Sequence, residues 1–282
     1  MKSNFLRAGS FGFSLDRPLI MGIVNVTPDS FSDGGQYLDF RQAVSHALKL
    51  IEQGADILDV GGESTRPGAA PVPEEEELKR VLPVLETLVK RGLAVSVDTR
   101  SARVMREAIG AGAAMINDVT ALRGPEAIEA LAKSNAAICL MHMQGEPRTM
   151  QEAPVYQDVV REVRDFLAER ISACEQAGIE RNRIVIDPGF GFGKTLEHNL
   201  ALLKGLNRLV DLGAPVLAGM SRKSMLGALT GKPVDQREYA GVAANLAAVL
   251  RGASILRVHD VAATKDALKI WQAIEGEKTG EP

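Results

Sequence analysis

The stretch LIMGIVNVTPDSFSDGG, residues 19–35, begins as a buried strand and ends as a long polar loop. Residues 19–26 are mostly apolar, whereas Thr, Asp and Ser dominate the following positions until Gly34 and Gly35. A connection that only turns the chain can be much shorter. This pattern predicts a core strand whose end carries functional residues, with Asn25 at the boundary.

The same pattern of a short apolar run followed by a longer helical pattern recurs along the chain. The runs lie at residues 19–26, 55–62, 93–99, 113–120, 136–143, 183–189, 214–221 and 253–260. They are continuous rather than alternating, which is typical of parallel strands buried on both faces. Eight such units in one chain predict an α/β fold, a (β/α)8 TIM barrel. A doubly wound sheet is the main alternative, and the even spacing and lack of a second domain count against it.

The whole chain, residues 1–282, is predicted to be one domain. The barrel is expected at about residues 18–276, with a frayed tail at 277–282. Residues 4–16 predict a short hairpin that plugs the bottom of the barrel. The run EEEE at residues 74–77 is expected to be a solvated helix start.

Composition excludes several classes of function. The net charge of −3 and pI of about 5.9 argue against a nucleic-acid partner, which needs a basic face. Cys139 and Cys174 lack CxxC spacing, and Cys139 lies in an apolar run typical of a core. The first residues lack a secretory pattern, and no apolar run is long enough to span a membrane. We therefore expect a cytoplasmic protein with no membrane partner.

Polar side chains end every predicted strand, where barrel enzymes build their active sites. They are Asn25, Asp59 with Glu63, Asp98, Asn117 with Asp118, His142, Asp187, Ser221 with Arg222 and Lys223, and Arg257 with His259 and Asp260. Helix capping is an equally good explanation for a single position such as Asp98 or Asp187. It does not explain the whole set, because buried charges are costly unless they are paired or liganded.

The acceptors in this set suit one kind of ligand. Asp98, Asn117 and Asp187 can accept from a ring that presents an N–H beside an amino group, while Lys223 faces a ring carbonyl.

A second, cationic group is expected on the other side of the site. Arg66, Arg257 and His259 suit an anionic leaving group such as diphosphate, with magnesium. No nucleophile and base pair is evident, so the chemistry is expected to depend on positioning and charge stabilisation.

Seven motifs together resemble dihydropteroate synthase of the bacterial folate pathway. They are MGIVNVTPDSFSDGG (21–35), DVGGESTRPGA (59–69), INDV (116–119), LMHMQG (140–145), DPGFGFGKT (187–195), GMSRKS (219–224) and RVHD (257–260). The resemblance covers residues 18–275, and this order of motifs is highly specific.

The resemblance implies a transferase that joins para-aminobenzoate to (7,8-dihydropterin-6-yl)methyl diphosphate. The products are 7,8-dihydropteroate and diphosphate, and sulfonamides are inhibitors. Because the dihydropterin ring can delocalise positive charge, we expect an SN1-like path. The resemblance also implies Mg²⁺ as the cofactor, small-molecule substrates and a homodimer.

The resemblance assigns roles by position. Asn25 is the metal contact, and Lys223, Arg257 and Asp98 are the catalytic residues. The substrate contacts are Asp98, Asn117, Asp187 and Lys223 for the pterin, Arg257 and His259 for diphosphate, Thr65 as a further contact, and Phe31, Arg66, Pro67, Phe192 and Ser224 for para-aminobenzoate. Met141 is expected to touch the pterin ring, whereas His142 points the other way and receives no role.

Two other functions remain open at this point. A methyltetrahydrofolate:corrinoid methyltransferase shares the pterin barrel, but it binds no diphosphate. A pterin-binding protein without catalysis is the second alternative. The STRPG loop (64–68) and the cationic ends SRKS (221–224) and RVHD (257–260) argue against the first alternative. Intact Lys223, Arg257 and His259 argue against the second.

Overall fold

The computed structural model describes residues 4–26, 36–63, 72–145 and 149–275. Eight parallel strands form one sheet in the order β8-β7-β6-β5-β4-β3-β10-β9. These strands are β3 (Leu19–Asn25), β4 (Ile57–Gly61), β5 (Val95–Asp98), β6 (Met115–Asp118), β7 (Ala137–Met141), β8 (Ile184–Asp187), β9 (Leu217–Ala218) and β10 (Ile255–Val258). A parallel bridge between Ile186 and Val216, with the Ile186 amide 3.0 Å from the Pro215 oxygen, joins the two edges. The predicted (β/α)8 barrel is therefore confirmed.

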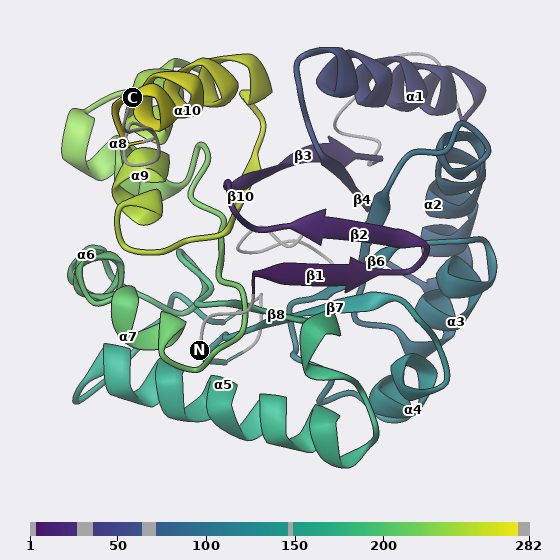
Figure 1. Cartoon of the computed structure of the whole chain (residues 1–282), viewed down its shortest axis with the longest axis horizontal. Helices are drawn as coiled ribbons and strands as arrows, with labels where there is room; N and C mark the ends of the chain where they lie inside the picture. The colour runs from purple at the N-terminus through teal and green to yellow at the C-terminus, as the bar shows by residue number, and fades with distance from the viewer. Residues whose placement is uncertain (1–3, 27–35, 64–71, 146–148, 276–282) are drawn as a thin grey trace, which may run out of the picture.

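Helices follow the strands and surround the sheet (Figure 1). They are α1 (Gln36–Glu52), α2 (Glu74–Val89), α3 (Ala102–Gly110), α4 (Ala127–Ala132), α5 (Val159–Gln176), α6 (Leu196–Lys204), α7 (Asn207–Val210), α8 (Ser224–Thr230), α9 (Glu238–Val249) and α10 (Val261–Glu275), with short 3-10 turns η2 (Arg181–Arg183) and η3 (Val234–Gln236). In the part of the chain described, no helix is both long and apolar enough to cross a membrane.

Alternation along each strand divides the core into two parts. In β4, Leu58 and Val60 belong to the cluster between the sheet and the helices, whereas Ile57 belongs to the cluster inside the barrel. Cys139 is fully buried in this inner cluster, as the sequence predicts. Asp59 follows the inward pattern of Ile57, so a carboxylate lies above the apolar filling of the barrel.

The predicted N-terminal hairpin is present and covers one end of the barrel. Strand β1 (Phe5–Ala8) pairs antiparallel with β2 (Phe11–Ser14), and the hairpin crosses the barrel end that faces the viewer in Figure 1. Leu6, Ala8 and Leu15 belong to the same apolar cluster as the inward residues of the strands. The hairpin thus closes the bottom of the core, as the sequence predicts.

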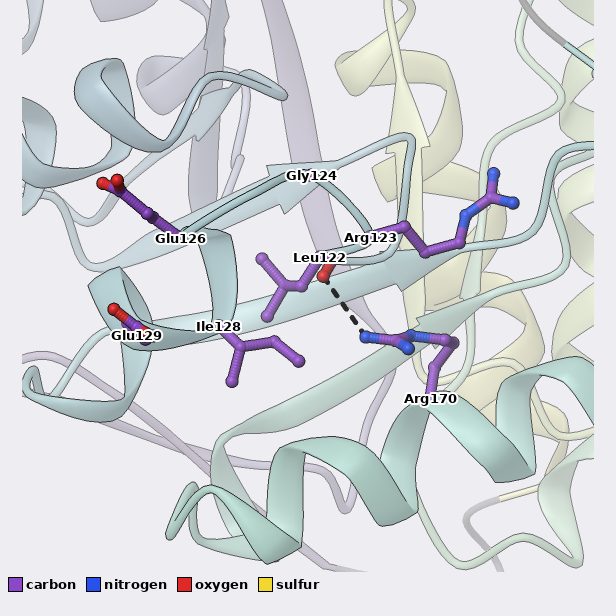
Figure 2. Close-up of a pocket in the computed structure, with 7 residues that line it drawn as sticks. All are labelled: Leu122, Arg123, Gly124, Glu126, Ile128, Glu129 and Arg170. Carbon is purple, nitrogen blue, oxygen red and sulfur yellow. Dashed lines mark hydrogen bonds between the residues drawn. The ribbon is translucent and has the colours of Figure 1, made fainter.

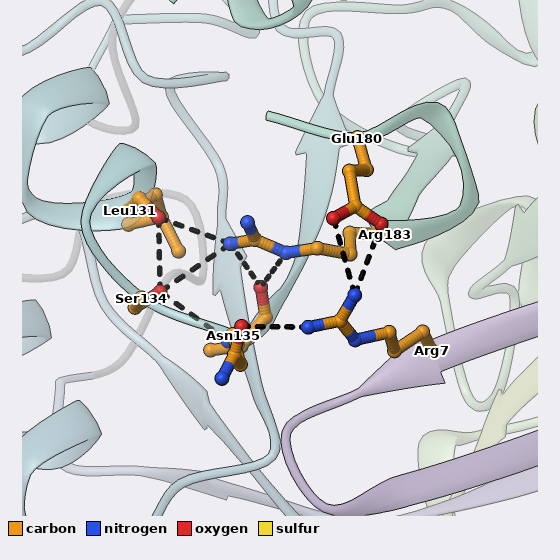
Figure 3. A network of polar contacts seen from close by, with 7 residues as sticks. Arg7, Leu131, Ser134, Asn135, Glu180 and Arg183 are labelled. Carbon is orange, nitrogen blue, oxygen red and sulfur yellow. Dashed lines mark hydrogen bonds and ion pairs between the residues drawn. The ribbon is translucent and has the colours of Figure 1, made fainter. Parts of the chain in front are cut away.

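A polar network ties this hairpin to the barrel (Figure 3). Arg7 donates to Glu180 at 3.0 Å and to Asn135 at 2.7 Å. Nearby, the buried Arg183 guanidinium donates to the backbone oxygens of Leu131 and Ala136 at 3.0 and 2.7 Å. These bonds lie away from the polar strand ends and stabilise the closed end.

The expectation of a solvated run at residues 74–77 is wrong for its last member. Glu74 and Glu75 are exposed, but Glu77 is only 2% exposed in the first turn of α2. Thr99 hydrogen-bonds to its carboxyl group, and Oε1 has no partner in the described structure. Burial raises the pKa of Glu77 to about 7, although the Thr99 bond opposes this shift.

Candidate active site

The register of the strands brings the predicted acceptors to one level at the mouth of the barrel. Asn25 lies opposite Gly61, Gly61 opposite Asp98, and Asp98 opposite Asn117 on successive strands. On the neighbouring pair, Asp187 lies opposite Met141. Because parallel strands end at the same edge, residues distant in sequence form one ring of polar groups.

Arg257 forms ion pairs with two carboxylates at this mouth. Its Nε is 2.6 Å from Asp59 Oδ2, and its Nη2 is 2.8 Å from Asp98 Oδ2. The Asn117 amide nitrogen donates to the same Asp59 oxygen at 3.1 Å. The sequence interpretation placed Arg257 opposite the acceptors, but the structure pairs it directly with one of them.

Asp59 is a residue of this site that the sequence-based list of contacts omits. Its side chain is fully buried, and Oδ1 has no hydrogen-bond partner among the described residues. A charged residue at an inward position of an apolar strand was the available signal. Its role follows from the contacts, since it orients both Arg257 and Asn117.

These contacts leave a defined set of acceptor oxygens. Asn117 uses its amide nitrogen on Asp59, so its oxygen remains available. Asp98 uses Oδ2 on Arg257, and Asp187 uses Oδ1 to accept from the Gly189 amide at 2.7 Å. Within the described structure, one oxygen of each of these three side chains therefore has no hydrogen-bond partner. Neither Asp98 nor Asp187 caps a helix, since Ser101 and Thr195 cap α3 and α6.

Asp118 shows the opposite outcome. Both of its oxygens are used locally, with bonds from Thr120 at 2.7 and 2.8 Å and from the Leu122 amide at 2.7 Å. Asp118 caps no helix, since Glu126 occupies the N-cap position of α4; its carboxylate instead stabilises the turn after β6.

Burial sets the electrostatics of the mouth. Burial raises the pKa of Asp98 and of Asp187, while the cations Arg257 and Lys223 respectively oppose the rise. Burial also lowers the pKa of Lys223 to about 8, with Asp187 acting against that shift. Burial opposes the charge of Arg257 as well, yet Asp59 and Asp98 outweigh it and the pKa of Arg257 is raised.

Lys223 reaches the mouth from the turn that precedes α8. Its ammonium donates to the Phe190 backbone oxygen and lies 4.4 Å from the centre of the Phe192 ring. Ser224, the first residue of α8, is exposed. The structure therefore joins Lys223 to the loop after β8, which also carries the predicted contact Phe192.

Two further predicted contacts lie at the rim. His259 Nδ1 is 3.0 Å from Ser221 Oγ, whose oxygen also accepts from the His259 amide at 3.2 Å. Met141 packs in a small apolar cluster with Val119, Met143, Met150 and, at its edge, Phe192. Met141 thus lies beside Asp187 at the mouth of the barrel.

Asn25, the predicted metal contact, is half-buried at the last position of β3. Among the residues described, no group of three or more His, Cys, Asp or Glu side chains could hold a metal ion. Asn25 offers a single amide oxygen, which would suit Mg²⁺ held mainly by water and by the phosphate oxygens of a substrate. Phe31, Thr65, Arg66 and Pro67 lie outside the described residues.

A separate surface hollow of about 380 Å³ lies beside α4 and α5 (Figure 2). It is lined by Leu122, Arg123, Gly124, Glu126, Ile128, Glu129 and Arg170. Arg170 already donates to the Ala121 and Leu122 oxygens at 2.9 and 3.2 Å, and the remaining charges are of both signs. None of the residues that make up the polar ring lines this hollow, and we assign it no ligand.

Comparisons with known proteins agree with this geometry. The model of the pterin binding enzyme family matches residues 21–259. The dihydropteroate synthase of Haemophilus influenzae is 52% identical over 269 residues, which cover 95% of this chain and 98% of that protein. The solved dihydropteroate synthase of Xanthomonas albilineans with 4-aminobenzoic acid is 56% identical, with a TM-score of 0.92 and coverage of 97% and 99%. That of Burkholderia cenocepacia complexed with 7,8-dihydropteroate is 50% identical, with a TM-score of 0.90 and coverage of 98% for both chains. The chain therefore belongs to the pterin-binding enzymes and, within them, to the dihydropteroate synthase family.

Proposed function

We propose that the polar ring at the barrel mouth binds the pterin ring and holds the diphosphate during its departure. The reaction is that of the family: para-aminobenzoate and (7,8-dihydropterin-6-yl)methyl diphosphate give 7,8-dihydropteroate and diphosphate, a transferase step in folate biosynthesis. The assignment of individual residues to this reaction is our proposal.

The unpaired acceptor oxygens carry this proposal. Asp98, Asn117 and Asp187 each keep one oxygen free after their contacts within the described structure. A pterin presents adjacent N–H and amino donors, which pair with such oxygens, and Lys223 can donate to its ring carbonyl. Met141 would contact the face of the ring.

These groups also suit an SN1-like path. The C–O bond of the methylene breaks first, and the electron pair leaves with the diphosphate. The buried carboxylates Asp98 and Asp187 stabilise the positive charge left on the pterin, while Arg257 and His259 bind the departing anion. The amine of para-aminobenzoate then forms the C–N bond and releases a proton. No base is needed before the cation forms.

Asn25 would hold magnesium together with the diphosphate oxygens. Bound there, Mg²⁺ would neutralise charge on the leaving group. Arg257 alone is poorly suited to that task, because Asp59 and Asp98 already balance much of its charge.

The second substrate is proposed to bind beside the loop after β8. Phe192 and Ser224 lie next to Lys223 in sequence or space, so they can form one wall of this pocket. Phe31, Thr65, Arg66 and Pro67 are proposed to complete the pocket.

We also propose a homodimer in the cytoplasm. Large apolar side chains are exposed on the neighbouring helices α8, α9 and α10 (Figure 1), at the C-cap of α9 and on the η3 turn that precedes α9 in sequence. They are Leu229, Val234, Tyr239, Leu250, Ile270 and Ile274, each more than half exposed. Several large exposed apolar side chains on neighbouring elements are a feature of protein interfaces. Sedimentation of the wild type and of an Ile270→Glu variant tests this, since the variant should be monomeric at concentrations where the wild type is dimeric.

Incubation of the purified protein with both substrates and Mg²⁺ tests the proposed function. Formation of 7,8-dihydropteroate, detected by mass, is expected, together with loss of product in an Asp98→Asn variant that remains folded. A protein that binds pterin without turnover would support the binding-protein alternative. Full activity of a folded Asp98→Asn variant would remove the proposed role of this residue.

A further inference from the structure

The loop after β8, residues 188–194, is packed unusually closely against the end of β7. Gly189 has a φ of 68°, and a Cβ atom at this position would lie 1.9 Å from the His142 backbone oxygen. Only glycine can combine that conformation with that contact. We call residues 188–194 the β8 loop.

Lys194 ends the β8 loop, and its ammonium turns back under it. The side chain is 3% exposed, and Nζ lies 3.0 Å from the Gly189 oxygen, 2.9 Å from the Phe192 oxygen and 3.0 Å from His142 Nδ1. Nζ also lies 3.4 Å from the His142 backbone oxygen, so four acceptors surround the three N–H donors of the ammonium. Burial lowers the pKa of Lys194 to about 7, although the charge of Asp187 opposes this shift. No carboxylate forms an ion pair with Lys194 in the described structure.

The histidine partner is suited to accept this bond. His142 is buried, and its ring meets Phe166 edge-on with centroids 5.0 Å apart. Burial lowers the pKa of His142 to about 3, and the charge of Lys194 adds to that effect. The ring is therefore neutral near pH 7 and keeps a nitrogen that can accept from Lys194.

The same loop touches two residues of the candidate site. The Gly189 amide donates to Asp187 Oδ1 at 2.7 Å, and the Phe190 oxygen accepts from Lys223. The Phe192 ring also lies against the Lys223 ammonium. Any displacement of the loop therefore moves the groups that hold both side chains.

We infer that Lys194 is a positioning residue: its bonds to Gly189, Phe192 and His142 fix the β8 loop on β7, so that the loop holds Asp187 and Lys223 at the barrel mouth. This inference rests on the proposed function only in taking Asp187 and Lys223 as pterin contacts. The placement of the loop itself can be tested without turnover.

The chain offers a matched control for the loss of a buried cation. Arg183 is also 3% exposed and donates to backbone oxygens, but it lies near the hairpin at the closed end of the barrel (Figure 3). Lys194→Met and Arg183→Met each remove a buried cation from backbone acceptors. Both should lower stability, whereas only Lys194→Met should affect the mouth.

Two readouts distinguish positioning from stability alone. Hydrogen exchange follows the Phe192 amide, which donates to the Gly189 oxygen at 3.1 Å, and titration with a non-reacting hydroxymethylpterin measures ligand affinity. For folded Lys194→Met we expect exchange at Phe192 and the pterin Kd each to rise by at least about tenfold. Arg183→Met should leave both within about twofold of the wild type, even if it unfolds as easily.

A milder variant keeps the inference falsifiable if Lys194→Met does not fold. Lys194→Gln retains two N–H donors on a shorter side chain and should give effects of the same sign but smaller size. Wild-type exchange at Phe192 in either folded Lys194 variant, or equal loss of pterin affinity in Arg183→Met, would overturn the inference. A wild type that binds pterin without turnover would instead count against the proposed function and leave both readouts usable.

Discussion

Replacing Asp187 by asparagine tests the pterin contact most sharply, because the structure predicts how the new amide will orient. The Gly189 amide needs an acceptor and now has Asp187 Oδ1 at 2.7 Å. In Asp187→Asn the amide oxygen must take that position to keep the bond. The NH2 group then replaces the free carboxylate oxygen and presents a donor to the donors of the pterin.

The size of the effect follows from this exchange. The ligand loses a hydrogen bond to a charged acceptor, and a donor at a nearly buried position is left unpaired, since Asp187 is 5% exposed. Together these changes cost about 2–3 kcal/mol, which corresponds to a roughly 30- to 150-fold lower affinity for pterin. The fold should survive, because the Gly189 bond is kept. The substitution also removes a carboxylate whose burial disfavours its charged form.

Calorimetric titration with a non-reacting hydroxymethylpterin measures this change directly. Asp118→Asn is the matched control, since Asp118 is a buried strand-end carboxylate whose oxygens serve only Thr120 and Leu122. The control should lose stability but bind pterin like the wild type. Asp187→Asn should show at least a tenfold rise in the pterin Kd. Unchanged affinity in a folded Asp187→Asn protein would show that Asp187 does not contact the pterin.

The other predictions concern pH, binding order and inhibitors. Burial raises the pKa of Glu77 from 4.5 to about 7, so the folded state holds a proton that the unfolded chain releases, and stability falls as pH rises through this range. The stability of Glu77→Gln relative to wild type, measured by urea unfolding, should therefore be greater at pH 8 than at pH 4 by on the order of 3 kcal/mol, and a pH-independent difference would be contrary evidence. Para-aminobenzoate should bind poorly to the free enzyme and well once pterin, magnesium and diphosphate are present, and equilibrium dialysis that found equal binding would refute this order. Sulfonamides resemble para-aminobenzoate in shape and charge, so they should compete with it in steady-state kinetics, and competition with the pterin diphosphate instead would contradict the second pocket. Substitution of Phe31 or Pro67 should weaken the binding of sulfonamides more than the binding of para-aminobenzoate.

The fold could be predicted from the sequence because every barrel strand is a continuous apolar run. Such runs arise when one face meets the barrel interior and the other meets the helices. Strand ends were less predictable. The run at 214–221 contains only the short strand β9, and at its start Pro215 has no amide hydrogen to donate to a neighbouring strand.

The identities of the mouth residues could be read from the strand ends, but their pairings could not. Arg257 and Asp59 are separated by 198 positions, so their contact depends on closure of the barrel. Local patterns carry no information about which oxygen of Asp98 pairs with Arg257, or that Asn117 uses its amide nitrogen on Asp59. The structure was needed to find the free acceptors.

The burial of Glu77 is indicated by its position along the helix rather than by the composition of the surrounding run. Glu77 belongs to the same buried face of α2 as Leu78, Val81 and Leu85, at helical spacing. A run of four glutamates suggests exposure to solvent, yet its last member, Glu77, follows the helical spacing of the apolar residues. Glu77 then packs near Gly62, where an added Cβ would lie 3.2 Å from its Cγ.

Diphosphate release by the purified protein, measured alongside 7,8-dihydropteroate formation, tests the central claim most directly. With pterin diphosphate, Mg²⁺ and para-aminobenzoate, we predict equal amounts of both products, and a loss of both in folded Asp187→Asn that Asp118→Asn does not share. Folded wild-type protein that binds the pterin but releases no diphosphate, or an Asp187→Asn variant with full release, would contradict the account.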